Sequence, residues 1–192
     1  QTFRWSKAVL ESNQHYLDGK IVPMPCPAEY NFFFTHDLLL TDLGAVFFDA
    51  ERVKNDLLYL RSLTKVDSVL PHAYYWKDGS YQTEFCGSDN WNHLWFIILA
   101  GSYLKHTNDK ETLAKLFPII KKSIEMQLQN RGKDNLMYAM RPDWWDIGNV
   151  YGARSYITSL MIRALREYVY ICYRLGNEVN DLSTYLNLSN RM

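Results

Sequence analysis

Leu94-Trp95-Phe96-Ile97-Ile98-Leu99-Ala100 is an unbroken apolar stretch near the middle of the chain. A helix that is apolar on every side has no face to present to water, so it lies in the interior of a protein. The preceding residues Asp89-Asn90-Trp91-Asn92-His93 suit the start of a helix, which we expect to run to about His106. We expect the rest of the chain to pack around this inner helix.

Amphipathic helices are expected on both sides of this stretch. The clearest covers residues 110–129, and the longest covers residues 153–175, where Gly176-Asn177 ends it. Further helices are expected over residues 3–17, 38–48 and 50–64, and from about residue 178 onward. The sequence lacks the apolar–polar alternation that is typical of strands. It therefore predicts an all-α fold without strands, in a single domain over residues 1–192.

The connections between these helices alternate in length. Short polar turns at residues 49–50, 107–109 and 176–177 alternate with long segments at 20–37, 64–88 and 131–152, which are rich in aromatic and acidic residues. When antiparallel hairpins lie side by side, the short turns fall at one end and the long loops at the other. We expect binding residues among the gathered loops. The residues expected to meet there are His36, Asp37, Trp76, Asp89, Trp91, Asp143, Trp145 and Asp146.

The last long loop contains Asp143-Trp144-Trp145-Asp146. Carboxyl groups that move protons and flat rings that hold sugars are the combination that carbohydrate chemistry uses. The alternative is a helix cap with two packing tryptophans, because Asp is a favoured cap residue and Trp commonly anchors a core. Asp37 is likewise open to two interpretations, as a helix cap or as a ligand-binding residue. At the start of the inner helix, we expect Trp91 to face a ligand and Trp95 to lie in the core.

These motifs together resemble the catalytic domain of (α/α)6-barrel glycoside hydrolases. The resemblance is closest to the glucosidase domain of glycogen-debranching enzymes, followed by trehalase-like and α-glucosidase-like families. Phe34-Thr35-His36-Asp37 resembles the family's aromatic-Arg-Asp motif, with His36 in place of the Arg. Residues 88–96 resemble the segment that leads into an inner helix of the barrel. Asp143-Trp144-Trp145-Asp146 resembles the Trp-x-Asp motif, which makes Asp146 the general acid and Asp143 its neighbour.

The resemblance implies about half of a toroid, because the family's barrel has twelve helices and six or seven are predicted here. It also implies inverting cleavage of an oligosaccharide or polysaccharide. The catalytic base would lie in a C-terminal part that completes the barrel and that this chain lacks. In half a toroid, we expect the inner helix at residues 94–99 to be exposed for the missing helices. Besides Asp143 and Asp146, the residues expected to bind substrate are Tyr30, His36, Asp37, Trp76, Asp89, Asn90, Trp91, Arg141, Trp145 and Asn149.

Composition limits the other function classes. The 21 Lys and Arg residues balance 21 Asp and Glu residues, which disfavours a nucleic-acid partner, and no apolar run has the length of a membrane span. The histidines and the three cysteines lack metal-ligand spacing, so we expect no metal or other cofactor, and the compartment stays open. Two alternatives to hydrolysis stay open. One is a phosphorylase of the same fold, with His36, Arg141 and Arg154 as basic groups; the other is a non-catalytic helical module that binds carbohydrate or protein.

Overall fold

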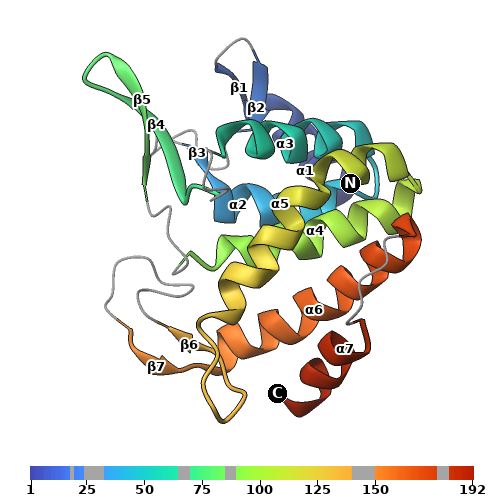
Figure 1. Cartoon of the computed structure of the whole chain (residues 1–192). Coiled ribbons are helices and arrows are strands. Elements are labelled where there is room, and N and C mark those ends of the chain that lie inside the picture. Colours follow the sequence, from blue (N-terminus) through green and yellow to red (C-terminus); the bar gives the residue numbers. More distant parts are fainter. Residues whose placement is uncertain (18–19, 24–32, 65–69, 85–89, 140–149, 177–181) are drawn as a thin grey trace.

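Figure 1 shows a computed structural model of the protein, which is built mainly of helices. The structure describes residues 1–17, 20–23, 33–64, 70–84, 90–139, 150–176 and 182–192. After α1 (Thr2–Ser12) come three consecutive helical hairpins. They are α2 (Thr35–Ala45) with α3 (Ala50–Leu63), α4 (Asn92–Thr107) with α5 (Lys110–Leu128), and α6 (Ser155–Leu175) with α7 (Leu182–Arg191).

The hairpins stand side by side, with their first helices in one layer and their second helices in another. α4 contacts both α2 and α6, and in the second layer α3 contacts α5. The three neighbouring hairpins form a partial toroid, the half-ring of this chain, whose helices Figure 1 shows. The predicted all-α architecture, with antiparallel hairpins forming about half of a toroid, is confirmed. No helix within the described ranges is long and apolar enough to cross a membrane.

The apolar stretch at residues 94–100 lies at the centre of the fold. Within residues 94–99, only Trp95 is more than 5 % exposed. α2, α3, α5 and α6 all contact α4 and together enclose it. The expectation that this stretch is exposed in half a toroid is wrong, because the helices of this chain alone cover it. The large apolar side chains that do reach solvent lie elsewhere, as in α1, where Phe3 and Trp5 are 63 % and 66 % exposed.

Short antiparallel strands lie in the long connections, so the expectation of a fold without strands is wrong. β1 (Gln14–Leu17) pairs with β2 (Lys20–Pro23), and the helix expected over residues 3–17 ends at Ser12. β3 (Phe33–Phe34), β4 (Ala73–Lys77) and β5 (Ser80–Glu84) form a three-stranded sheet. β6 (Tyr138–Ala139) pairs with β7 (Gly152–Ala153).

The β4–β5 hairpin had a signal in the sequence. Asp78 and Gly79 form its turn with φ of 53° and 77°, the positive values that suit a tight turn between twisted strands. An Asp-Gly pair between aromatic runs is a recognised hairpin signal. A search for period-two alternation missed it, because Tyr74, Tyr75 and Trp76 are consecutive aromatic residues.

Candidate functional site

The N-terminal ends of α2, α4 and α6 lie at one end of the half-ring (Figure 1). The β3–β4–β5 sheet and the β6–β7 pair lie at this end, which we name the rim. The short connections from α2 to α3 and from α4 to α5 lie at the opposite end, which we name the turn end. The described helices and strands therefore have the predicted separation of long connections from short turns.

Four of the predicted site residues have described side chains, and all four lie at the rim. His36 and Asp37 are half-buried in the first turn of α2, while Asn90 and Trp91 are buried just before α4. Trp76 lies in β4, of which the structure describes the backbone. The remaining predicted site residues lie outside the described residues: Tyr30, Asp89, Arg141, Asp143, Trp145, Asp146 and Asn149.

Aromatic rings from three separate segments meet at the rim. The ring of His36 lies edge-on to the ring of Trp91, with 5.8 Å between their centroids. His72, which precedes β4, has its ring centroid 5.3 Å from that of Trp91 and 5.8 Å from that of Phe34. Trp91 is only 3 % exposed, so it packs inside this cluster. The structure thus places Trp91 in the kind of packed position that the sequence had suggested for Trp95.

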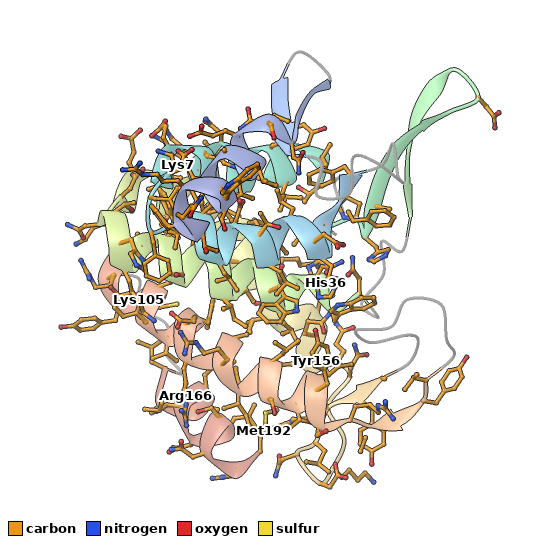
Figure 2. All side chains as sticks on the ribbon, turned by 180° about the vertical axis from the view of Figure 1, so that it is seen from behind. Lys7, His36, Lys105, Tyr156, Arg166 and Met192 are labelled. Atoms are coloured by element: carbon orange, nitrogen blue, oxygen red, sulfur yellow. The ribbon has the colours of Figure 1, made fainter. Side chains whose placement is uncertain are left out.

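Trp95 reaches the surface of the rim instead. Its Nε1–H donates a hydrogen bond of 3.1 Å to the hydroxyl of Tyr156, and its ring centroid is 6.3 Å from that of His36. His36, Trp95 and Tyr156 are all half-buried, and they come from α2, α4 and α6. Figure 2 shows His36 and Tyr156 toward the rim, away from Lys105 near the other end of α4. Sequence reasoning missed Tyr156, although it lies in the first turn of the helix that follows the Asp-Trp-Trp-Asp loop.

Asn90 holds the segment that leads into α4. Its Nδ2 donates to the carbonyl of Leu70 at 2.6 Å, and its Oδ1 accepts from the backbone N–H of Asn92 at 3.0 Å. Gln127 Nε2 donates to the carbonyl of Asn90 at 3.0 Å. Asn92 Nδ2 lies 3.2 Å from Nδ1 of His72. The Asn90 side chain is therefore engaged in positioning the rim, while its predicted contact with substrate stays a prediction.

His93 lies fully buried beneath the rim. Its Nδ1 is 3.0 Å from Oγ of Ser123, and burial lowers the pKa of the imidazole to about 3. The ring is therefore neutral near pH 7 and serves as a hydrogen-bonding core residue. Among the residues that the structure describes, no group of three His, Cys, Asp or Glu side chains could hold a metal ion.

The N-cap residues of the helices that begin at the rim do not cap them with their own side chains, although Oδ1 of Asn90 accepts from the N–H of Asn92, the first residue of α4. Their N-cap residues are Phe34, Trp91 and Arg154, and none of these side chains accepts a hydrogen bond from the first turn of its helix. The first N–H groups of a helix and its dipole give the N-terminus partial positive charge. Three such ends at one rim favour ligands or side chains that carry hydrogen-bond acceptors, such as carboxylates and hydroxyl oxygens.

The segment with the Asp-Trp-Trp-Asp motif is attached at the rim. Tyr138 pairs with Ala153 and Ala139 with Gly152, so the chain departs toward residue 140 and returns from residue 149 beside the same two strands. The backbone N–H of Arg154 also donates to the carbonyl of Met137 at 3.0 Å. Residues 140–149 thus leave and rejoin the described chain next to the N-terminal end of α6.

A cavity of about 290 Å³ lies beside α6 rather than among the three rings. Histidine, aspartate and glutamate are absent from its described lining, so it offers no acid or base for proton transfer. We therefore place the candidate site at His36, Trp95 and Tyr156, where three helices meet. The cavity is lined by Leu136, Ala153, Arg154, Ser155, Thr158, Ser159, Ile162 and Met192.

Comparison with known proteins finds matches in fold alone. No protein-family model and no curated protein sequence matches the chain. The solved structures that match include a rhamnosidase from Klebsiella oxytoca with rhamnose bound, at 17 % identity and a TM-score of 0.68 over 86 % of this chain. They also include a mannosylglycerate hydrolase of family GH63 from Thermus thermophilus in complex with glucose, at 13 % identity and a TM-score of 0.75 over 97 %.

A third match is the unsaturated glucuronyl hydrolase from Bacillus sp. GL1, at 13 % identity and a TM-score of 0.55 over 89 % of this chain. All three are glycoside hydrolases of the (α/α)-barrel type. The matched region covers 32 % of the rhamnosidase, 61 % of the mannosylglycerate hydrolase and 48 % of the glucuronyl hydrolase. This chain therefore has part of the fold that these glycoside hydrolases use.

Proposed function

We propose that this chain is part of the catalytic domain of a glycoside hydrolase that cleaves an oligosaccharide or polysaccharide with inversion. The observation that carries the proposal is the meeting of His36, Trp95 and Tyr156 at the rim, beside the strands from which residues 140–149 depart. Half-buried rings with polar edges suit a sugar, which has apolar C–H faces and hydroxyl groups around its edge. The glycoside hydrolases that share the fold support this proposal.

The chemistry is assigned to the two carboxyl groups of the Asp-Trp-Trp-Asp motif. Asp146 is the general acid, which gives its proton to the glycosidic oxygen as the bond breaks. The neighbouring Trp144 and Trp145 would raise the pKa of Asp146 by desolvation, so that it stays protonated near neutral pH. Asp143 hydrogen-bonds sugar hydroxyls or positions Asp146. The general base, about 6.5–9.5 Å from the acid in inverting enzymes, comes from the three hairpins that would complete the ring.

The motif resemblance narrows the proposal further, to the glucosidases of the glycogen-debranching kind. His36 and Asp37 take the place of the sugar-holding motif of that family, with the imidazole in place of a guanidinium. An imidazole makes at most two hydrogen bonds, whereas a guanidinium donates five, so His36 would hold fewer sugar hydroxyls.

The test is Asp146→Asn in the complete protein. Asn keeps the shape of the side chain but has no proton to donate, so we expect cleavage of a natural glycoside to fall by about 10²–10⁴-fold. The loss should be smaller for nitrophenyl glycosides, whose leaving group needs less protonation. Sugar affinity and unfolding temperature should stay close to those of the unmodified protein. Hydrolysis rates and the anomeric configuration of the first product, followed by NMR, are the measurements.

Two further variants make this test specific. Asp143→Asn should lower activity less than Asp146→Asn, whereas Asp134→Asn, an exposed carboxyl before β6, should leave activity unchanged. Full activity in both Asp143→Asn and Asp146→Asn would remove the motif from the mechanism. Cleavage that requires phosphate and releases a sugar phosphate would replace the hydrolase by a phosphorylase. Sugar binding without any cleavage would replace it by a non-catalytic module.

A further inference from the structure

α4 and α6 are joined in two different ways along their length. Near the turn end they approach so closely that a Cβ at Gly101 would collide with the carboxylate of Glu167. Glu167 is 2 % exposed and accepts from Nζ of Lys105 at 2.5 Å. At the rim, the same helices are bridged by Trp95 and Tyr156, two large side chains that both keep part of their surface open. The tight contact at Gly101 already joins the two helices. The partly open rings of Trp95 and Tyr156 are therefore available for a role besides joining α4 to α6.

The hydrogen bond between Trp95 and Tyr156 limits how each can meet a ligand. The indole has a single N–H donor, and in Trp95 that donor is directed to the Tyr156 hydroxyl. A ligand therefore meets Trp95 through the apolar carbon atoms of the ring and not through its N–H. The hydroxyl of Tyr156 fixes the tilt of that ring, which stands 38° from the plane of the His36 ring. His36 adds a polar neighbour at one side of the ring.

Trp91 does not offer such a surface. Its side chain is 3 % exposed, and its Nε1–H has no hydrogen-bond partner among the described residues. The ring centroids of His36 and His72 lie within 6 Å of its own. A sugar ring therefore has access to Trp95 and not to Trp91.

We infer that Trp95 is the ring on which the bound sugar stacks, and that Tyr156 is the positioning residue that holds the Trp95 ring at its angle. This inference rests on the proposed function and assigns residues of that same site. It draws on the described geometry of three helices and does not depend on residues 140–149. It predicts a site for a neutral sugar ring with an apolar face, next to a histidine.

Kinetics of matched variants test the inference. In the complete protein, we measure kcat and KM with nitrophenyl glycosides of glucose and rhamnose for Trp95→Phe, Trp95→Ala and Tyr156→Phe. Stacking is present in both the ground state and the transition state, so KM should rise while kcat changes little. We expect KM to rise about tenfold for Trp95→Ala and roughly threefold for Tyr156→Phe, with Trp95→Phe between Trp95→Ala and the unmodified protein.

Tyr103→Phe is the matched control for the lost hydroxyl. The Tyr103 hydroxyl donates to Oδ2 of Asp109 at 2.8 Å near the turn end, so its removal should lower the unfolding temperature without changing KM. A purely structural Tyr156 would behave in the same way. If Tyr156→Phe lowers stability and leaves KM unchanged, the positioning role is overturned.

Tryptophan fluorescence provides a second readout that does not require catalysis. Addition of glucose or rhamnose should change the emission of the unmodified protein and of Trp5→Phe, since Trp5 is 66 % exposed on α1, away from the rim. Trp95→Phe should lose this change. If Trp95→Phe keeps both the fluorescence change and the original KM in a protein that cleaves these glycosides, the inference alone fails. If the unmodified protein neither binds these sugars nor cleaves any glycoside, the proposed function fails together with the inference.

Discussion

At the turn end, α3 and α5 each begin with a side-chain cap, whereas the N-cap residues of α2, α4 and α6 at the rim provide none. Asp49 accepts from the backbone N–H of Arg52 at 3.1 Å to start α3, and Asp109 accepts from the backbone N–H of Thr112 at 2.9 Å to start α5. At the rim, the N-cap positions of α2, α4 and α6 are taken by a phenylalanine, a tryptophan and an arginine that make no such bond. The best cap residues therefore stand where no site is expected.

The two ends also differ in their ion pairs. The part of α6 nearer the turn end carries Glu167, which is paired with both Lys105 and Arg163. Between α2 and α3, the buried Arg52 lies 3.9 Å from Asp42 and 3.7 Å from Asp56. The described part of the rim also carries Asp37 and Arg154, but its packed centre is a cluster of histidine and aromatic rings. We interpret the turn end as the part selected for stability and the rim as the part selected for binding, a division that proteins commonly show.

The largest loss of stability is expected from Arg52→Met. The Arg52 guanidinium lies beside two buried carboxyl groups and donates to the carbonyl of Leu10 at 2.7 Å, which attaches α1. Removal of one partner from a buried ion cluster lowers the free energy of unfolding by about 3–5 kcal/mol. Urea denaturation measures the loss, and Lys54→Met, at a more exposed ion pair, should lose far less. Activity per folded molecule should be unchanged. A large drop in that activity would contradict the interpretation that the turn end serves stability and the rim serves binding.

The same cluster makes stability depend on pH. Burial raises the pKa of Asp42 to about 7, against a usual value of 3.8, and burial also raises the pKa of Asp56. Between the unfolded and folded pKa values the folded protein binds more protons than the unfolded chain. The free energy of unfolding should therefore fall as the pH rises through this range, with a slope of up to about 1.4 kcal/mol per pH unit for each of the two carboxyl groups.

Denaturation curves at a series of pH values check this dependence. Asp42→Asn, which cannot ionise, should flatten the slope, whereas Glu111→Gln, at an exposed carboxyl, should leave it in place. A free energy of unfolding that rises over the same pH range would contradict the raised pKa values of Asp42 and Asp56.

Asn90→Ala is the variant in which stability and function should change together. Loss of the amide leaves the carbonyl of Leu70 and the N–H of Asn92 without their partner, and each unsatisfied buried group destabilises by about 1–3 kcal/mol. We expect a loss of about 2–3 kcal/mol, because part of the gap can admit water. Activity should also fall, since Asn90 holds the start of α4 at the rim. Asn187→Ala, at an exposed position on α7, is the control.

The smallest effect is expected from Asp109→Ala. This carboxylate caps α5, accepting from the backbone N–H and Oγ1 of Thr112 and from the hydroxyl of Tyr103. Loss of a helix cap lowers the free energy of unfolding by about 1 kcal/mol. Thermal unfolding should show that change with the kinetics of cleavage unaltered. An altered KM would show that the turn end also influences the site.

The helices were predictable because their signal is local. The expected helix over residues 50–64 is α3, Ala50–Leu63, and the one over residues 153–175 is α6, Ser155–Leu175. In both, one apolar stripe at helical spacing marks the buried face, and that stripe is visible in a window of a few turns. The described strands were missed because they are two to five residues long, too short for a periodic signal, and some depend on partners distant in sequence. β3, for example, pairs with β4 forty residues later through Phe33 and Tyr74.

The order of short and long connections in the sequence was enough to predict that the described ends of the long connections lie at one end of a helical scaffold. Alternation along the chain becomes separation in space whenever consecutive helices are antiparallel, so no tertiary information was needed. The tertiary structure alone decided which ring is open at that end. Trp91 and Trp95 are four residues apart, so helical spacing predicts the same side of the helix for both and cannot tell which of them is exposed. Trp91 is covered because His36 and His72 come from other parts of the chain to pack against it, whereas Trp95 is left partly open beside Tyr156.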